Sequence, residues 1–131
     1  RQRPDLAINK FVTAIKNQTP IQMYGDGSTS RDYTFVKDTV AGIRAAMEYE
    51  SSKFEIFNLG NSYPVKLIEL IESIEDVLGK KAIIDSLPEQ IGDVPHTLAD
   101  ISKAKVFLNY SPKTSLTEGL KQFIEWKESL E

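Results

Sequence analysis

The sequence contains no cysteine, a single histidine and no hydrophobic run near the roughly twenty residues that span a bilayer. The absence of cysteine excludes disulfide bonds, thiolate metal sites and cysteine nucleophiles, and it is typical of a cytoplasmic protein. A net charge of only -3, from 16 basic and 19 acidic residues, provides no basic surface for nucleic acid. We therefore expect a cytoplasmic protein that binds neither nucleic acid nor membrane.

The size and composition of the chain favour one ordinary domain. Its 131 residues are 40% hydrophobic and 27% charged, which is enough to build a core and too apolar for intrinsic disorder. We treat residues 1–131 as a single domain. The first residue is Arg1 rather than methionine, so we expect the chain to begin inside a longer protein.

Hydrophobic periodicity and turn residues predict a mixed, helix-rich α/β fold with few, short strands. Gly79 is typical of the position after a helix, and Ser115 with Glu118 forms a capping-box pattern at the start of another. Helices are expected from Asp5 to Pro20, from Asp38 to Tyr49, from Pro64 to Leu78, from Asp100 or Ser102 to Leu108, and from Ser115 onward. Strands are expected at residues 21–24, 32–36, 54–59 and 81–84, giving the order α-β-β-α-β-α-β-α-α.

The common metal-binding and dinucleotide-binding patterns are missing. His96 has no second histidine or cysteine as a partner, so a loop histidine that forms a hydrogen bond is favoured over a metal ligand or a catalytic base. The turn Gly25-Asp26-Gly27 has Ser30 where a dinucleotide fingerprint needs its third glycine, and an extended segment follows it instead of a helix. We interpret it as a turn.

Two tyrosine–lysine pairs have the four-residue spacing by which a helix brings a lysine close to a tyrosine hydroxyl and lowers its pKa. Tyr33 and Lys37 lie in a predicted extended segment, where such a spacing corresponds to about 13 Å. Tyr49 and Lys53 lie across a predicted helix end. We therefore expect no catalytic pair in this chain.

Arginine is scarce, with four residues, and three of the four border turns or helix starts. A guanidinium in such a place can bind a carboxylate or phosphate through two hydrogen bonds, as Arg31 could after its turn. Arg3 lies beside a predicted helix N-terminus, which favours anions. Composition alone favours the simpler interpretation, in which these arginines are solvated surface charges.

Six short motifs occur in an order specific to one superfamily. They are Arg1–Ala7 (RQRPDLA), Tyr24–Gly27 (YGDG), Arg31–Asp38 (RDYTFVKD), Phe57–Asn61 (FNLGN), Gly92–Pro95 (GDVP) and Ala99–Ala104 (ADISKA). This order resembles the C-terminal part of the extended short-chain dehydrogenase/reductase enzymes that act on nucleotide sugars. The first motif and the segment Gln90–Pro95 are similar to the UDP-glucuronate 4-epimerase branch of that family.

The resemblance implies an enzyme whose N-terminal Rossmann domain, with NAD and the catalytic tyrosine and lysine, lies outside this chain. In the implied reaction NAD takes hydride from C4 of UDP-glucuronate, and its return to the other face of the 4-keto sugar gives UDP-galacturonate. This chain would be the UDP-sugar-binding portion, inactive and monomeric by itself, of a homodimeric enzyme that supplies polysaccharide precursors. Phe54–Leu59 would be a sheet-edge strand that has lost its neighbour.

The resemblance also assigns substrate contacts residue by residue. It assigns Arg31 to the UDP diphosphate, Asp93 to the ribose hydroxyls and Arg3 to the sugar carboxylate. Gln90 stands where many relatives have a second diphosphate-binding arginine, a replacement that weakens the implied phosphate contact.

Four further positions complete the implied site. Met23 and Tyr24 match the segment that lines the uracil pocket. Asp5 and Leu6 would face the substrate at the start of the first helix.

Other interpretations remain open within the family and outside it. A UDP-glucuronate decarboxylase and a nucleotide-sugar 4,6-dehydratase share these motifs, and a non-catalytic interaction domain is the alternative of another class. The hypotheses make different structural predictions. A substrate-binding domain has Arg31 and Asp93 in one cleft beside Tyr24, whereas an interaction domain leaves Arg31 and Asp93 on unrelated surfaces.

Overall fold

The computed structural model describes residues 6–130, which form five helices and four short strands in the expected order. The helices are α1 (Ala7–Lys16), α2 (Val36–Met47), α3 (Leu67–Leu78), α4 (Ser102–Leu108) and α5 (Leu116–Glu128). The strands are β1 (Ile21–Tyr24), β2 (Ser30–Asp32), β3 (Pro64–Lys66) and β4 (Ile84–Leu87). None of the helices in this range has the length and hydropathy to cross a membrane.

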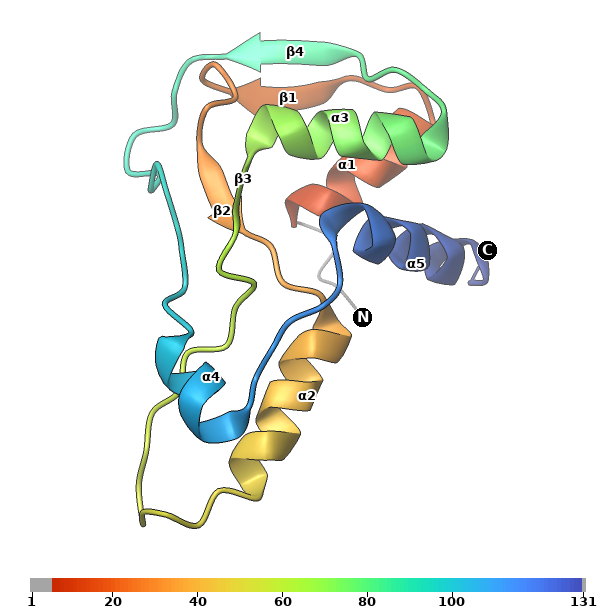
Figure 1. Ribbon diagram of the computed structural model, residues 1–131. Coiled ribbons are helices and arrows are strands. Elements are labelled where there is room, and N and C mark those ends of the chain that lie inside the picture. The colour runs from red at the N-terminus through yellow and green to blue at the C-terminus, as the bar shows by residue number, and fades with distance from the viewer. Residues whose placement is uncertain (1–5, 131) are drawn as a thin grey trace.

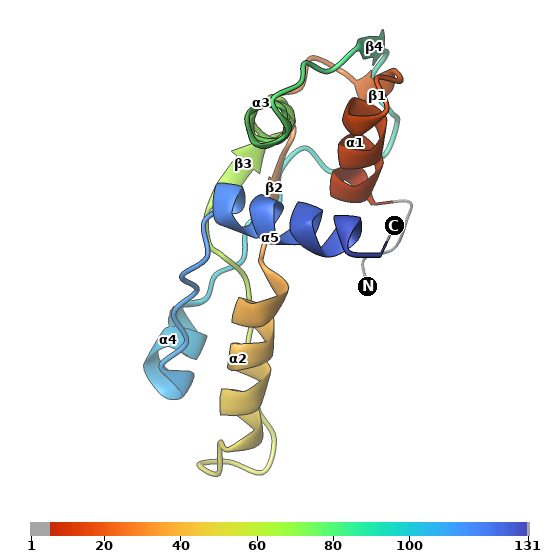
Figure 2. The same cartoon turned by 90° about the vertical axis from the view of Figure 1, so that its right-hand side faces the viewer.

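The elements form two regions joined by extended segments (Figure 1). The larger region, here called the sheet region, holds α1, α3, α5 and the parallel pair β1–β4. The smaller one, the α2–α4 region, lies at the other end of the molecule, and Figure 2 shows it beyond α5. The antiparallel pair β2–β3 lies between them.

The core of the sheet region follows from helical periodicity. Helix α1 buries Phe11, Val12 and Ile15, whose three- and four-residue spacings place them on one face. Helix α3 carries a similar apolar face and ends at Gly79, whose φ of 63° is the left-handed conformation expected after a helix. Ser115 Oγ accepts a hydrogen bond from the Glu118 amide at the start of α5, so this predicted cap is confirmed.

Strand β1 divides its side chains between two faces. Ile21 and Met23 are buried in the core, while Gln22 and Tyr24 are exposed on the opposite face. β1 pairs in parallel with β4 from Ile21 opposite Ile84 to Tyr24 opposite Leu87. This alternation separates the side chains of two residues that the sequence had placed in one pocket.

The fourth strand begins three residues later than predicted. It runs from Ile84 to Leu87 rather than over residues 81–84. The reason is a carboxylate: Glu75 Oε1 accepts a hydrogen bond from the Ala82 amide at 2.7 Å, and its Oε2 contacts Lys81 Nζ at 2.6 Å. Residues 81 and 82 are thereby held against the end of α3 before the chain enters the sheet.

The predicted strand at 54–59 is wrong, because this part of the structure forms no strand. Its side chains still alternate: Phe54 and Ile56 are exposed, while Phe57 and Leu59 pack against the small core of the α2–α4 region. No neighbouring strand among the described residues supplies ladder hydrogen bonds for this segment. The third strand is instead β3, paired with β2.

The second predicted strand is displaced toward the N-terminus, since β2 covers Ser30–Asp32 and α2 begins at Val36. One face of helix α2 is apolar and exposed. We call it the α2 stripe: Val36, Val40, Ile43 and Met47, with exposed fractions of 64%, 47%, 48% and 80%. Its opposite side approaches the core so closely that a Cβ on Gly42 would lie 2.6 Å from Leu59 Cδ2.

Candidate ligand-binding site

Strand β2 is held from both sides at the centre of the molecule. On one side it pairs with β3, with Arg31 opposite Val65. On the other side the Ser30 amide donates to Pro95 O at 2.8 Å, and Ser30 O accepts from the Thr97 amide at 3.1 Å. The loop that follows β4 is therefore attached to the strand that carries Arg31.

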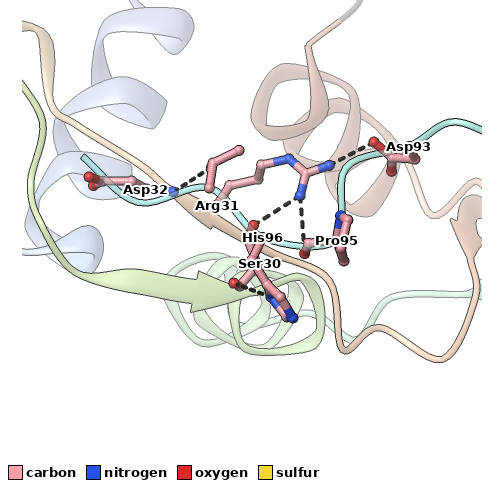
Figure 3. A network of polar contacts seen from close by, with 7 residues as sticks. Ser30, Arg31, Asp32, Asp93, Pro95 and His96 are labelled. Atoms are coloured by element: carbon pink, nitrogen blue, oxygen red, sulfur yellow. Dashed lines mark hydrogen bonds and ion pairs between the residues drawn. The ribbon is translucent and has the colours of Figure 1, made fainter. Parts of the chain in front are cut away.

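The guanidinium of Arg31 collects three acceptors at this junction (Figure 3). Its Nη2 donates to Asp93 Oδ1 at 2.7 Å, and its Nη1 donates to Ser30 O at 2.9 Å and Pro95 O at 3.4 Å. A guanidinium has five N–H groups, so these contacts leave Nε–H and one Nη2 hydrogen. Free N–H groups of a guanidinium can form charge-assisted hydrogen bonds to a phosphate or a carboxylate.

An open cleft of about 1390 Å³ lies in front of Arg31, between α1, β1 and the loop after β4. Five of the eight residues predicted for the site line this cleft: Leu6, Tyr24, Arg31, Gln90 and Asp93. Arg31 and Asp93 keep part of their side chains accessible, at 30% and 49%. The cleft thus offers a cation, a carboxylate, an amide and an exposed aromatic ring to one ligand.

The other three predicted residues are placed differently or not at all. The side chain of Met23 is 8% exposed and belongs to the core of the sheet region, because β1 turns it away from the cleft. Any contact of Met23 with a ligand in the cleft would therefore involve its main chain. Arg3 and Asp5 lie outside the described residues.

Residues 1–123 match the protein family described as GDP-mannose 4,6 dehydratase. The chain belongs to this family. The resemblance to the C-terminal part of the extended short-chain dehydrogenase/reductase enzymes is thereby confirmed, as is the mixed α/β fold class. The chain is therefore a member of the nucleotide-sugar epimerase and dehydratase group.

Three longer proteins are similar to nearly the whole of this chain. An uncharacterized protein of Methanocaldococcus jannaschii, MJ1055, is 48% identical over 124 residues, covering 95% of this chain and 38% of that protein. A UDP-glucuronate 4-epimerase of Thermodesulfobacterium geofontis is 40% identical over 131 residues, covering 98% of this chain and 40% of the relative. The UDP-glucuronic acid 4-epimerase of Bacillus cereus, solved in complex with UDP-glucuronic acid and NAD, superposes with a TM-score of 0.89 at 32% identity, covering 100% of this chain and 42% of that one. The chain spans about two-fifths of these relatives.

For this family member, the arrangement of the cleft distinguishes two hypotheses formed from the sequence. An interaction domain was expected to leave Arg31 and Asp93 on unrelated surfaces, whereas a substrate-binding domain was expected to place them in one cleft beside Tyr24. The structure joins them in an ion pair and places all three residues in the same cleft. The geometry therefore favours the substrate-binding hypothesis.

Sequence reasoning missed Asp32, a structural residue of the site. Its carboxylate accepts hydrogen bonds from the amides of Asn61, Ser62 and Ala99, at 3.0, 3.0 and 3.1 Å. It therefore connects β2 to two distant segments and fixes the strand that carries Arg31. The glycine at position 60 is related to this role, because a Cβ there would come within 2.8 Å of Asp32 Oδ2.

A cation on α5 was also missed as part of the site. Lys127 lines the cleft, and its Nζ donates to Asn9 Oδ1 at 2.7 Å and to Thr13 Oγ1 at 2.6 Å. No spacing in the sequence links Lys127 to α1. Only the tertiary contact shows that its charge reaches the wall of the cleft.

Tyr33 and Lys37, the first tyrosine–lysine pair, have separate surroundings, and Tyr33 packs against the core of the sheet region. Burial raises the pKa of the Tyr33 phenol, with the nearby Arg31 charge opposing that rise, so Tyr33 stays protonated near neutral pH. Lys37 Nζ donates to Gln122 Oε1 on α5 at 2.7 Å. His96, as expected, forms a hydrogen bond, with 3.0 Å between its Nδ1 and Ser30 Oγ.

Proposed function

We propose that this chain is the UDP-sugar-binding portion of an NAD-dependent epimerase that interconverts UDP-glucuronate and UDP-galacturonate. The observation that carries the proposal is that Arg31, which keeps two N–H groups for a ligand, lines one cleft with Tyr24, Gln90 and Asp93. A diphosphate needs a fixed bidentate cation, ribose hydroxyls need an acceptor, and a uracil ring needs a flat apolar surface. The cleft has one group of each kind.

The residues of this chain do not fit NAD. In the turn from Gly25 to Gly27 both glycines have positive φ values and lie against Glu89 and Ile68, and the next element in the described part of the chain is strand β2 rather than a helix. We place NAD and the catalytic tyrosine and lysine on an N-terminal Rossmann domain of the complete enzyme. The described residues contribute binding and orientation, so we expect this chain alone to be inactive.

The exposed apolar surface of the α2–α4 region supports the proposal of a separate Rossmann domain in the complete enzyme. The α2 stripe is exposed, as are Phe54 at 79% and Ile56 at 65% on the neighbouring segment. Isolated exposed apolar residues are ordinary, but a contiguous set marks an interface. We propose that the Rossmann domain covers this surface and that residues 54–59 complete its sheet as an edge strand.

Titration of UDP into the protein tests the binding role. We expect weak binding, with a Kd above the micromolar range, because half of the site is on the other domain. Replacing Arg31 with alanine removes a charge-assisted contact and should weaken binding by about 1.5–3 kcal/mol. Arg44→Ala, on the exposed surface of α2, is the matched control and should leave the Kd unchanged. Sub-micromolar binding, or equal affinities of the two variants, would contradict the proposal.

The reaction itself is tested on the complete enzyme with NAD and UDP-glucuronate. An epimerase gives UDP-galacturonate, a decarboxylase gives a UDP-pentose with release of carbon dioxide, and a 4,6-dehydratase gives a 4-keto-6-deoxy sugar from a neutral hexose substrate. The family description keeps the dehydratase as the second candidate. Mass spectrometry identifies the pentose product, NMR distinguishes UDP-galacturonate from UDP-glucuronate, which has the same mass, and a parallel reaction with a neutral nucleotide-hexose detects the dehydratase product.

A further inference from the structure

Ser30 is a polar residue that is buried in the structure. It is 7% exposed, and Glu75 is the other buried polar or charged residue in the described part of the chain. A buried hydroxyl without a partner is destabilising, so the partner of this one matters. That partner is His96, whose Nδ1 lies 3.0 Å from Ser30 Oγ.

This pair lies behind the cleft rather than in it. Successive side chains of a strand point to opposite faces, so Ser30 points away from the face that Arg31 occupies. Figure 3 shows the His96 ring and the Ser30 hydroxyl on the other side of β2 from the Arg31 guanidinium. The cleft is lined by Arg31, Asp93 and Thr97, and neither Ser30 nor His96 is among its lining residues.

The atoms around the pair also hold the guanidinium. Ser30 O accepts from both Arg31 Nη1 and the Thr97 amide. Pro95 O accepts from both Arg31 Nη1 and the Ser30 amide. A displacement of residues 95–97 along β2 would therefore move Pro95 O and, two residues earlier in the chain, Asp93, which are two of the three acceptors of Arg31.

Few other contacts oppose such a displacement. The loop from Pro88 to Leu98 is exposed throughout, and Ile91 is fully exposed. The contacts that hold this loop on β2 are the two main-chain hydrogen bonds of Ser30, a 3.2 Å bond from the Asp32 amide to Thr97 Oγ1, the Arg31 contacts and the Ser30–His96 pair. The pair is the one side-chain contact there that is independent of Arg31 and of the cleft.

We propose that Ser30 and His96 are positioning residues that set the register of the loop on β2 and thereby the geometry of Arg31 and Asp93 toward the diphosphate and ribose of the ligand. The ligand part of this inference rests on the proposed function. The register part concerns the unliganded protein and can be measured without any ligand.

Two substitutions of His96 separate its hydrogen bond from its bulk. His96→Asn keeps a polar atom at the δ position that Nδ1 occupies, whereas His96→Phe keeps a ring and loses the hydrogen bond. Ser30→Ala removes the other partner. Ser73→Ala is the matched control, since Ser73 Oγ bonds only to Glu69 O within α3.

The first measurement is amide hydrogen exchange of Ser30 and Thr97 in the unliganded protein, and the second is the Kd for UDP. We expect His96→Phe and Ser30→Ala to speed exchange at Thr97 and to raise the Kd about three- to tenfold, the effect of one neutral hydrogen bond. His96→Asn and Ser73→Ala should stay within about twofold of the parent protein. The double variant Ser30→Ala/His96→Phe should be no worse than either single one, because both remove the same interaction.

Equal behaviour of His96→Phe and His96→Asn, or unchanged exchange at Thr97 in both His96→Phe and Ser30→Ala, would overturn the positioning role. If no variant and not even the parent protein binds UDP, the proposed function fails, and exchange alone then decides whether the pair sets the loop register.

Discussion

The sheet region and the α2–α4 region bury apolar surface in very different amounts. The core of the first has ten buried residues from α1, α3, α5 and β1, joined by Val65 of the adjoining β3, with Leu70 and Ile74 at 0% exposure. The second has four, Ile101, Ala104, Leu108 and Tyr110, and carries an exposed apolar stripe on α2. The same chain thus holds one region that completes its own core and one that leaves an apolar face uncovered. The second region has the character of half an interface.

The largest expected difference between the two regions comes from substituting one large apolar side chain by alanine in each of them. Leu70→Ala opens a cavity in a core with no accessible surface and should lower the free energy of unfolding by about 2–5 kcal/mol. Met47→Ala, at a position 80% exposed on the α2 stripe, should change it by less than about 0.5 kcal/mol. Urea denaturation of both variants measures the difference. Similar losses for the two would show that the α2 stripe is buried in solution.

A smaller effect is expected where the α2–α4 region depends on a polar contact. The Tyr110 hydroxyl, on a residue 4% exposed, donates to Gly60 O at 2.9 Å and joins the end of α4 to the segment before β3. Tyr110→Phe leaves that carbonyl unpaired and should cost about 1–2 kcal/mol in the same denaturation experiment. Tyr63→Phe, at a position 66% exposed, is the control and should be neutral. A neutral Tyr110→Phe would mean that packing alone holds this small core.

The sheet region has its own polar anchor, and its contribution depends on pH. The Lys81 ammonium, with help from the Ala82 amide, holds the pKa of the Glu75 carboxyl below its usual 4.5, and burial opposes this effect. A carboxyl with a lowered pKa in the folded state stabilises the protein above its unfolded pKa, and that contribution is lost as pH falls through the folded pKa. Glu75→Gln should therefore lower the Tm at pH 7, and the difference from the parent should vanish at pH values below the folded pKa of Glu75.

The control for this pH dependence is Glu125→Gln, an exposed carboxylate on α5. It should leave the Tm unchanged at both pH values. If the Tm difference caused by Glu75→Gln persists undiminished at low pH, the stabilisation comes from the shape of the side chain rather than from its charge.

Features of the fold that depend on short-range interactions could be predicted from the sequence, whereas features that depend on long-range contacts could not. Helices α1, α3 and α5, and the left-handed Gly79, depend on neighbours three or four residues away and were predicted from periodicity. The prediction of a strand at 54–59 was wrong, because alternation reports which side chains are buried but not whether a neighbouring strand pairs with the segment. The true third strand depends on Arg31 meeting Val65, a contact that no local pattern contains.

The site shows the same division. Arg31 and Asp93 are 62 residues apart, and only the family resemblance brought them together before the structure did. The inclusion of Met23 with Tyr24 was an error of local reasoning, because the alternation of a strand already indicates that adjacent side chains face opposite ways. The roles of Asp32 and Ser30, and the identity of the hydrogen-bond partner of His96, were not predicted because they consist of tertiary hydrogen bonds.

The smallest expected effect on stability comes from a substitution on the α2 stripe. It tests whether this surface is covered, since its effect should differ between this chain and the complete enzyme. Val40→Lys places a charge on the α2 stripe at a position 47% exposed and replaces a β-branched residue with a better helix former. In this chain the free energy of unfolding should rise by a few tenths of a kcal/mol or stay constant. In the complete enzyme, where we propose that the Rossmann domain covers α2, the same change buries a charge and should be destabilising. A neutral result in both proteins would leave the α2 stripe as ordinary surface and would remove the interdomain contact from the proposed architecture.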